Sequence, residues 1–122
     1  MTKIAIIEDD PTISQMYRMK FEADGFDVRM AGNGKIGVEL VKSFKPDIIL
    51  LDIQMPEMDG AAALKLIREH KGSKDTPVII LTNLGEEEAP SEMRSLGISS
   101  YIVKANNTPR QVVAHVKNTI GQ

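Results

Sequence analysis

The sequence predicts an α/β protein of the doubly wound class, with a five-stranded parallel sheet covered by helices on both faces. Three observations lead to this prediction. Short apolar runs rich in β-branched residues recur along the chain, they are continuous rather than alternating, and segments with helical spacing separate them. Continuous apolar runs are typical of strands covered on both faces. Strict alternation of strand and helix favours a parallel sheet with right-handed crossovers, (βα)₅.

The first two strands flank the first predicted helix. Residues 4–7 form the first apolar run. The helix after it carries apolar groups at i, i+3, i+4 and i+8 from Ile13 to Phe21, and Gly25 is its expected stop. Residues 26–31 form a weaker strand candidate that the same glycine sets off.

The middle of the chain continues the alternation. Residues 34–44 and 60–70 show helical spacing less cleanly, with Asn33 and Asp59 as their expected N-caps. Between them, residues 48–51 form a continuous apolar run, which we predict as the third strand.

The fourth and fifth strands are predicted at residues 78–81 and 101–103. The segment between them, residues 86–96, contains Pro90, which would remove a backbone hydrogen bond from a helix that began at Glu86. We therefore expect a short or late-starting helix there.

The last helix is the most clearly marked one. Thr108 is an N-cap, Pro109 suits the first helical position, and Gln111 completes a capping box. An apolar stripe follows before Gly121 and consists of Val112, Val113, Val116 and Ile120.

Length and composition fit one domain over residues 1–122, with 42% hydrophobic and 26% charged residues. The net charge of −2 gives no basic surface strong enough to bind nucleic acid directly. The chain has no cysteine, which excludes disulfides, thiolate nucleophiles, iron–sulfur clusters and cysteine-ligated zinc. No apolar run exceeds four residues, whereas a membrane span needs about 20. We expect a cytoplasmic protein without a membrane segment.

Polar residues stand directly after four of the predicted strands. They are Glu8, Asp9 and Asp10, then Asp52, then Thr82 and Asn83, and finally Lys104. In doubly wound sheets, ligands bind outside the carboxyl ends of the strands. These side chains are therefore expected to converge on one site.

Three of these residues are candidate metal ligands. Glu8, Asp9 and Asp52 would raise one another's pKa values unless a cation lay between them. A hard divalent ion with oxygen ligands suits such a cluster, and Mg²⁺ is the expected ion, with Mn²⁺ as a substitute. Asp10, which stands before Pro11, is interpreted as a helix cap.

Residues 49–60, with the string ILLDIQMPEMDG, closely resemble the phosphorylation-site segment of the receiver domains of bacterial two-component response regulators. The string IIED at residues 6–9, Thr82 after the fourth strand, Tyr101 in the fifth, and Lys104 three residues later are similar too. The resemblance covers essentially the whole chain, and the joint order of these residues is highly specific. It implies the flavodoxin-like strand order 2-1-3-4-5.

By this resemblance, Asp52 is the phosphoacceptor that receives a phosphoryl group from a sensor histidine kinase or a phosphotransfer protein. Asp9, Asp52 and the backbone carbonyl of Gln54 would ligate Mg²⁺, and Glu8 would act through water. The expected chemistry is limited to phosphoryl acceptance and autodephosphorylation, so the resemblance does not imply an enzyme that turns over other substrates.

Thr82 and Lys104 match the hydroxyl and ammonium groups that contact phosphoryl oxygens, and Tyr101 matches the aromatic switch residue. Phosphoryl transfer depends on positioning and charge neutralisation, which these groups can supply. Movement of Thr82 toward the new oxygens would leave space for Tyr101, and so change the surface from the fourth strand to the fifth helix. An unknown downstream protein would bind there, to a monomer or to a homodimer promoted by phosphorylation.

The chain departs from the receiver pattern at two places. Ala105 replaces the proline that usually follows the lysine, often with a cis peptide bond, so the Lys104–Ala105 bond is open to either isomer. Asn83 replaces a smaller residue, and together with Gln54 it is expected to modulate access to Asp52.

Two other functions stay open at this point. A receiver-like protein-interaction module that is never phosphorylated is compatible with Asn83 and Ala105. A phosphatase with an aspartate nucleophile is disfavoured, because Gln54 stands where a second aspartate would be expected. The sequence does not distinguish a stand-alone receiver from part of a longer chain.

Overall fold

The computed structural model describes residues 1–55 and 57–121. Within these residues, five parallel strands form one sheet in the order β2-β1-β3-β4-β5. The strands are β1 (Lys3–Ile7), β2 (Asp27–Ala31), β3 (Ile48–Leu51), β4 (Val78–Thr82) and β5 (Ser100–Val103). The predicted fold class and the strand order 2-1-3-4-5 are confirmed.

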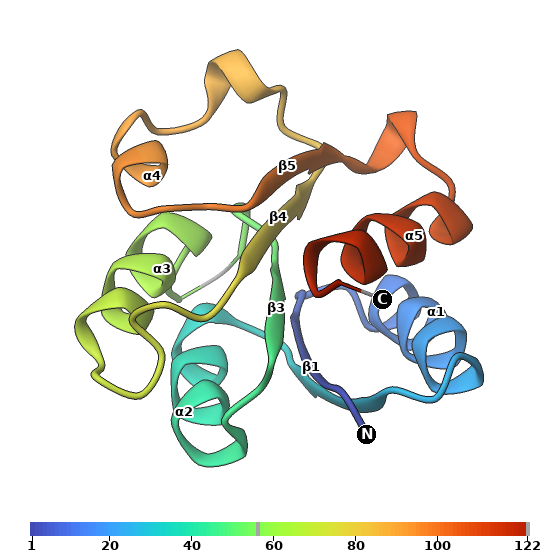
Figure 1. Cartoon of the computed structure of the whole chain (residues 1–122). Coiled ribbons are helices and arrows are strands. Elements are labelled where there is room, and N and C mark those ends of the chain that lie inside the picture. The colour runs from blue at the N-terminus through green and yellow to red at the C-terminus, as the bar shows by residue number, and fades with distance from the viewer. Residues whose placement is uncertain (56, 122) are drawn as a thin grey trace.

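Helices cover both faces of the sheet, with α1 and α5 on one face and α2, α3 and α4 on the other (Figure 1). They are α1 (Pro11–Ala23), α2 (Gly34–Phe44), α3 (Gly60–Glu69), α4 (Glu92–Ser95) and α5 (Pro109–Thr119). Two 3₁₀ turns, η1 (Glu86–Glu88) and η2 (Lys104–Asn106), lie in the second half of the chain. In the described part of the chain, no helix is both long enough and apolar enough to cross a membrane.

Each face of the sheet buries its own apolar core. The α1/α5 core includes Tyr17 and Phe21 of α1 and Val112 and Val116 of α5. The α2/α3/α4 core contains Val38 and Val41, Ala63, Leu64 and Ile67, and Met93. The strands contribute alternate residues to the two cores, which explains why the sequence shows continuous apolar runs.

The predicted helix caps are present. Asn33 accepts a hydrogen bond from the Ile36 backbone NH at 2.8 Å, and Asp59 accepts one from the Ala62 NH at 2.9 Å. Thr108 and Gln111 form the predicted capping box at α5.

The segment around Pro90 folds as a short 3₁₀ turn followed by a late helix of one turn. Pro90 lies between η1 and α4, and α4 has four residues. Met93 is the side chain that α4 buries in the core. The expectation of a short, late-starting helix is confirmed.

The register of the sheet brings the first acidic residues together. Ile7 pairs with Leu51 across β1 and β3, so Glu8 and Asp52 leave the sheet side by side. The Asp52 NH donates to the Ile7 carbonyl at 3.0 Å and continues the ladder by one bond. Adjacent parallel strands thus place the candidate site at the carboxyl edge of the sheet.

Candidate functional site

Three carboxylates gather beyond the ends of β1 and β3. Glu8, Asp9 and Asp52 each offer one oxygen, and these oxygens lie within 4.8 Å of one another. Glu8 and Asp52 are buried, whereas Asp9 is exposed. Carboxylate oxygens at this spacing fit a hard divalent cation, so the cluster could hold a metal ion.

Lys104 reaches this cluster from the end of β5. Its Nζ donates to Oε1 of Glu8 and lies 3.3 Å from Oδ2 of Asp52. The Lys104 side chain is 11% exposed, so the ion pairs are shielded from water. The described residues contain no cis peptide bond, and the trans Lys104–Ala105 bond leaves the ammonium within reach of Asp52.

Backbone amides hold the remaining oxygens of the two buried acids. The Gln54 NH donates to Oδ1 of Asp52 at 3.2 Å, and the Asp10 NH donates to Oε2 of Glu8 at 3.1 Å. Both oxygens of each buried carboxylate therefore have a donor, as buried charges require. Asp10 itself caps α1 by accepting from the Thr12 and Ile13 amides, as predicted.

Burial is the main electrostatic influence on Glu8. Desolvation raises the pKa of Glu8 to about 7, against the opposing effect of the hydrogen bond from Lys104, and the charge of Asp52 contributes least. The repulsion among the acids that the sequence predicts therefore contributes to the raised pKa of Glu8, but less than burial does. Burial alone would lower the pKa of Lys104, but its contacts with Glu8 and Asp52 outweigh burial and raise it.

Thr82 lies at the buried carboxyl end of β4, next to the strand that leads to Asp52. Its Oγ1 accepts a hydrogen bond from the Leu84 NH at 3.4 Å. Asn83, the next residue, is exposed. The hydroxyl thus stands at the carboxyl edge of the sheet and contacts the start of the following loop.

Tyr101 lies on β5 and packs against the α2/α3/α4 core while half-buried. Its hydroxyl donates to the Leu84 carbonyl at 2.7 Å and is 3.3 Å from the Gly85 carbonyl. Burial raises the pKa of Tyr101, and the nearby acids of η1 raise it further. Tyr101 and Thr82 therefore both contact Leu84.

A close backbone approach at Gly60 fixes the loop after β3. A Cβ at Gly60 would lie 2.3 Å from the Asp52 carbonyl oxygen and 2.6 Å from the Ile53 Cα. The Gly60 NH donates to the Ile53 carbonyl at 2.8 Å. Sequence reasoning missed this contact, although a glycine directly after the Asp59 cap was the available signal.

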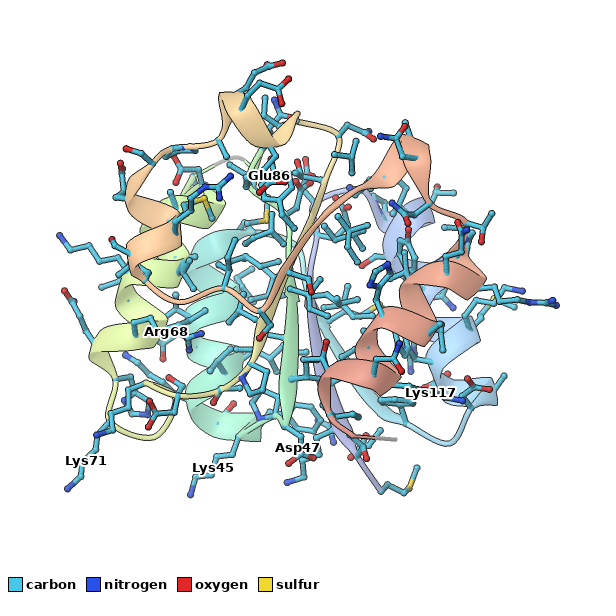
Figure 2. All side chains as sticks on the ribbon, turned by 45° about the horizontal axis from the view of Figure 1, so that its top comes forward. Lys45, Asp47, Arg68, Lys71, Glu86 and Lys117 are labelled. Carbon is cyan, nitrogen blue, oxygen red and sulfur yellow. The ribbon has the colours of Figure 1, made fainter. Side chains whose placement is uncertain are left out.

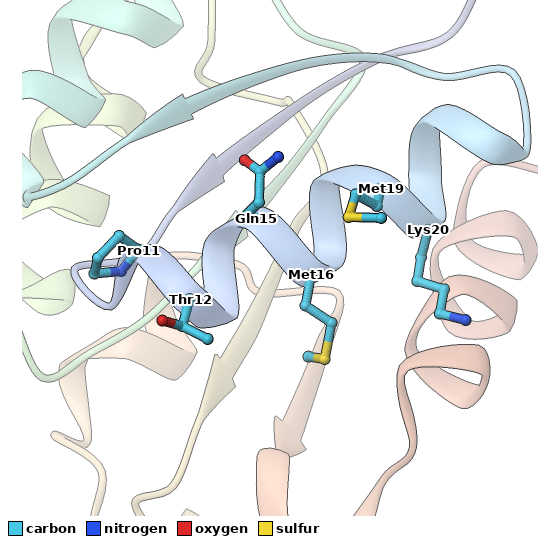
Figure 3. A pocket seen from close by; sticks show the side chains of 6 residues that line it. All are labelled: Pro11, Thr12, Gln15, Met16, Met19 and Lys20. Carbon is cyan, nitrogen blue, oxygen red and sulfur yellow. The ribbon is translucent and has the colours of Figure 1, made fainter.

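An apolar surface on α1 begins directly after the acid pair. Figure 3 shows Met16 and Met19 in a hollow that starts at Pro11 and ends at Lys20. Met16 is 37% exposed and Met19 is 63% exposed. The apolar stripe predicted for this helix is thus only partly buried, because Met16 faces solvent.

Comparisons with known proteins agree with this arrangement. Residues 4–117 match the family model of the response regulator receiver domain. The chain is 39% identical over 115 residues to the transcriptional regulatory protein SrrA of Staphylococcus aureus (strain NCTC 8325 / PS 47), covering 94% of this chain and 46% of SrrA. It is 36% identical over 104 residues to the regulatory protein AtoC of Escherichia coli (strain K12), covering 85% of this chain and 22% of AtoC. The chain therefore spans less than half the length of these two relatives.

Solved structures show the same likeness over the full fold. The chemotaxis protein CheY4 of Vibrio cholerae superposes with a TM-score of 0.90 at 25% identity, covering 98% of both chains. The receiver domain of the Francisella response regulator 1452 superposes with a TM-score of 0.86 at 30% identity, covering 99% of this chain and 98% of that one. The chain belongs to the response regulator receiver domain family.

Proposed function

We propose that residues 1–122 act as one receiver domain in which Asp52 accepts a phosphoryl group. The observation that carries this proposal is the setting of the Asp52 carboxylate. One of its oxygens is held by the Gln54 amide and the other faces the Lys104 ammonium, beside two further acids. Family membership implies a kinase or a phosphotransfer protein as the donor, and we propose a sensor histidine kinase or a histidine phosphotransfer protein.

The transfer step requires one bond to form and one to break. A carboxylate oxygen of Asp52 attacks the phosphorus, and the phosphorus–nitrogen bond of the donor phosphohistidine breaks, with its electron pair leaving on the imidazole nitrogen. The product is an acyl phosphate on Asp52. Such a reaction depends on an in-line nucleophile and on neutralised charge rather than on a general base.

Charged and polar groups of the chain would stabilise the transferred group. Lys104, whose Nζ lies 3.3 Å from Oδ2 of Asp52, would neutralise phosphoryl oxygens, and the Thr82 hydroxyl would donate to one of them. Asp9, Asp52 and the Gln54 carbonyl would hold Mg²⁺, or Mn²⁺ in its place, with Glu8 acting through water. The bound ion would supply positive charge beside the phosphoryl oxygens.

Signal output would start at Leu84, which both Thr82 and Tyr101 contact. When the Thr82 hydroxyl turns toward a phosphoryl oxygen, its contact with the Leu84 amide changes. Tyr101 then repacks, and the surface from β4 to α5 changes shape for a downstream protein. Asn83 and Gln54, both exposed near Asp52, would modulate access of donors and water.

Partner recognition would use the exposed apolar surface of α1. A phosphohistidine must come to the carboxyl edge of the sheet, and Met16 and Met19 lie on the helix that begins there. Apolar side chains in such a place favour a protein donor over a small molecule alone. We propose a monomer, or a homodimer promoted by phosphorylation, that neither binds nucleic acid directly nor turns over other substrates.

The unphosphorylated interaction module is not favoured. Such a module would have no use for the convergence of Asp52, Lys104 and the acid pair, which costs desolvation of several charges.

Intact mass after incubation with acetyl phosphate tests the proposal. We expect the wild type to gain one phosphoryl group with Mg²⁺ and none with a chelator, and Asp52→Asn to gain none. Asp24→Asn is the matched control, since Asp24 is an exposed acid paired with Lys117 away from the site, and it should label like the wild type. Equal labelling of Asp52→Asn and the wild type would contradict the assignment.

A further inference from the structure

Arg68, in the last turn of α3, donates hydrogen bonds from its guanidinium to main-chain carbonyls. Nε donates to Leu96 at 2.7 Å and Nη2 donates to Gly97 at 2.8 Å. Nη1 donates to Ser73 at 3.0 Å and to Thr76 at 2.7 Å. The half-buried side chain thus joins two loops, one leading into β4 and the other into β5.

These bonds are suited to a permanent anchor. A guanidinium keeps its charge at any physiological pH, and it holds its donors in a rigid planar fork. Hydrogen bonds from a charged donor are stronger than those between neutral groups. Figure 2 shows Arg68 on α3 beside the stretch of chain that leads from α4 into β5.

The chain that ends at this anchor is the segment of residues 84–97, called here the output segment. Tyr101 holds its beginning through the Leu84 and Gly85 carbonyls. An exposed ion pair of 2.7 Å between Arg94 and Glu86 ties α4 to η1, so the segment is braced internally.

The two ends of the output segment connect to different parts of the molecule. The first end leads through Leu84 to Thr82, at the carboxyl edge where Asp52 lies. The second end leads through Arg68 to α3 and to the loop before β4, at the opposite edge of the parallel sheet. A change at Asp52 can therefore reach the first end of the segment through Thr82 and Leu84. None of these contacts connects Asp52 to the second end.

We propose that Arg68 is the fixed pivot of the output segment, so that phosphorylation moves residues 84–88 and leaves residues 96–97 in place. Arg68 is a positioning residue: it contacts no reacting group and sets where the conformational change stops. This inference rests on the proposed function, because the pivot limits how far a conformational change that starts at Asp52 spreads.

Amide hydrogen exchange on the full chain, with and without Mg²⁺ and beryllofluoride as the phosphoryl mimic, tests the proposal. In the wild type, we expect the mimic to change exchange in residues 84–88 and to leave the Leu96, Gly97 and Ser99 amides unchanged. In Arg68→Met, the mimic should alter those three amides as well, by about tenfold in rate, as local opening reaches them. Arg94→Met is the matched control for the second end of the segment. It breaks the ion pair with Glu86 but keeps every Arg68 contact, so the mimic should still leave the Leu96, Gly97 and Ser99 amides unchanged.

Arg68→Lys keeps the charge but lacks the planar fork. It replaces Arg68→Met in the exchange experiment if Arg68→Met does not unfold cooperatively in urea. It should show the same spread of the change in weaker form. The pivot is overturned if the mimic already alters residues 96–99 in the wild type, or if the Arg68 variants confine the change as the wild type does. A wild type with no change anywhere, at Thr82 included, would instead overturn the proposed function and the pivot with it.

Discussion

The hydroxyl of Tyr101 donates to the carbonyl oxygen of Leu84 across 2.7 Å, and the amide of the same Leu84 donates to Thr82. One residue thus links the side chain at the end of β4 to the aromatic ring on β5. Because the two contacts use the amide and the carbonyl of Leu84, a displacement of that residue's backbone must affect both partners.

Tyr101→Phe removes the hydroxyl and keeps the ring. We expect a loss of about 1 kcal/mol in the free energy of unfolding, the usual net value of one hydrogen bond. Exchange of the backbone amides in residues 84–88 should become faster, while phosphorylation of Asp52 by acetyl phosphate stays intact. Urea unfolding and hydrogen exchange measure the two effects, and unchanged exchange in residues 84–88 would show that the hydroxyl does not hold this loop.

Glu8 makes metal-free stability depend on pH. Its pKa is raised from 4.5 to about 7 by burial, so the folded state binds a proton between these values that the unfolded state releases. The contribution of Glu8 is therefore fully present below pH 4.5 and is lost as pH rises through 7. Urea unfolding with a chelator should show wild-type stability falling relative to Glu8→Gln by about 1–3 kcal/mol over this range. Parallel pH profiles for the two proteins would contradict the shift.

Gly60→Ala tests the close backbone approach between Gly60 and Asp52, the proposed phosphoacceptor. A Cβ 2.3 Å from the Asp52 carbonyl oxygen must displace backbone, so we expect a loss of about 2 kcal/mol in stability and slower labelling of Asp52. Gly32→Ala is the matched control, because nothing lies within 4 Å of its added Cβ. Labelling by acetyl phosphate and thermal unfolding compare the two, and equal behaviour would mean that the loop adapts freely.

Met16→Lys tests the proposed docking surface on α1. We expect transfer from a cognate histidine kinase to slow by about tenfold, as when an apolar contact is lost from an interface, while labelling by acetyl phosphate is unchanged. Leu66→Lys is the control, because Leu66 on α3 is 38% exposed and Met16 is 37% exposed. Equal slowing in both variants would place the kinase contact elsewhere.

The strands and caps were predictable because their signals are local. The continuous apolar composition of residues 48–51 and 78–81 predicts buried strands. The capping box that begins at Thr108 is defined by four consecutive residues. The convergence of Glu8, Asp52 and Lys104 followed from the parallel topology, which puts all strand ends at one edge.

What escaped prediction depends on contacts between residues far apart in sequence. A basic residue near a helix end suggests only an interaction with the helix dipole, so nothing local indicates that Arg68 reaches Leu96. Likewise, the direct pairing of Lys104 with Glu8, and burial as the main cause of the raised pKa of Glu8, depend on the packed sheet. The assigned roles of Asp52, Thr82 and Tyr101 stay predictions for the experiments above.

Glu8 and Lys104 are 96 residues apart in the chain, yet they form one ion pair. The proposed phosphoacceptor site therefore exists only after the first strand and the end of the fifth have come together. A nascent chain whose β5 is still inside the ribosome has Asp52 but cannot yet bring Lys104 to it. Such a chain should be a poor acceptor, so newly made protein would not draw phosphoryl groups away from finished molecules.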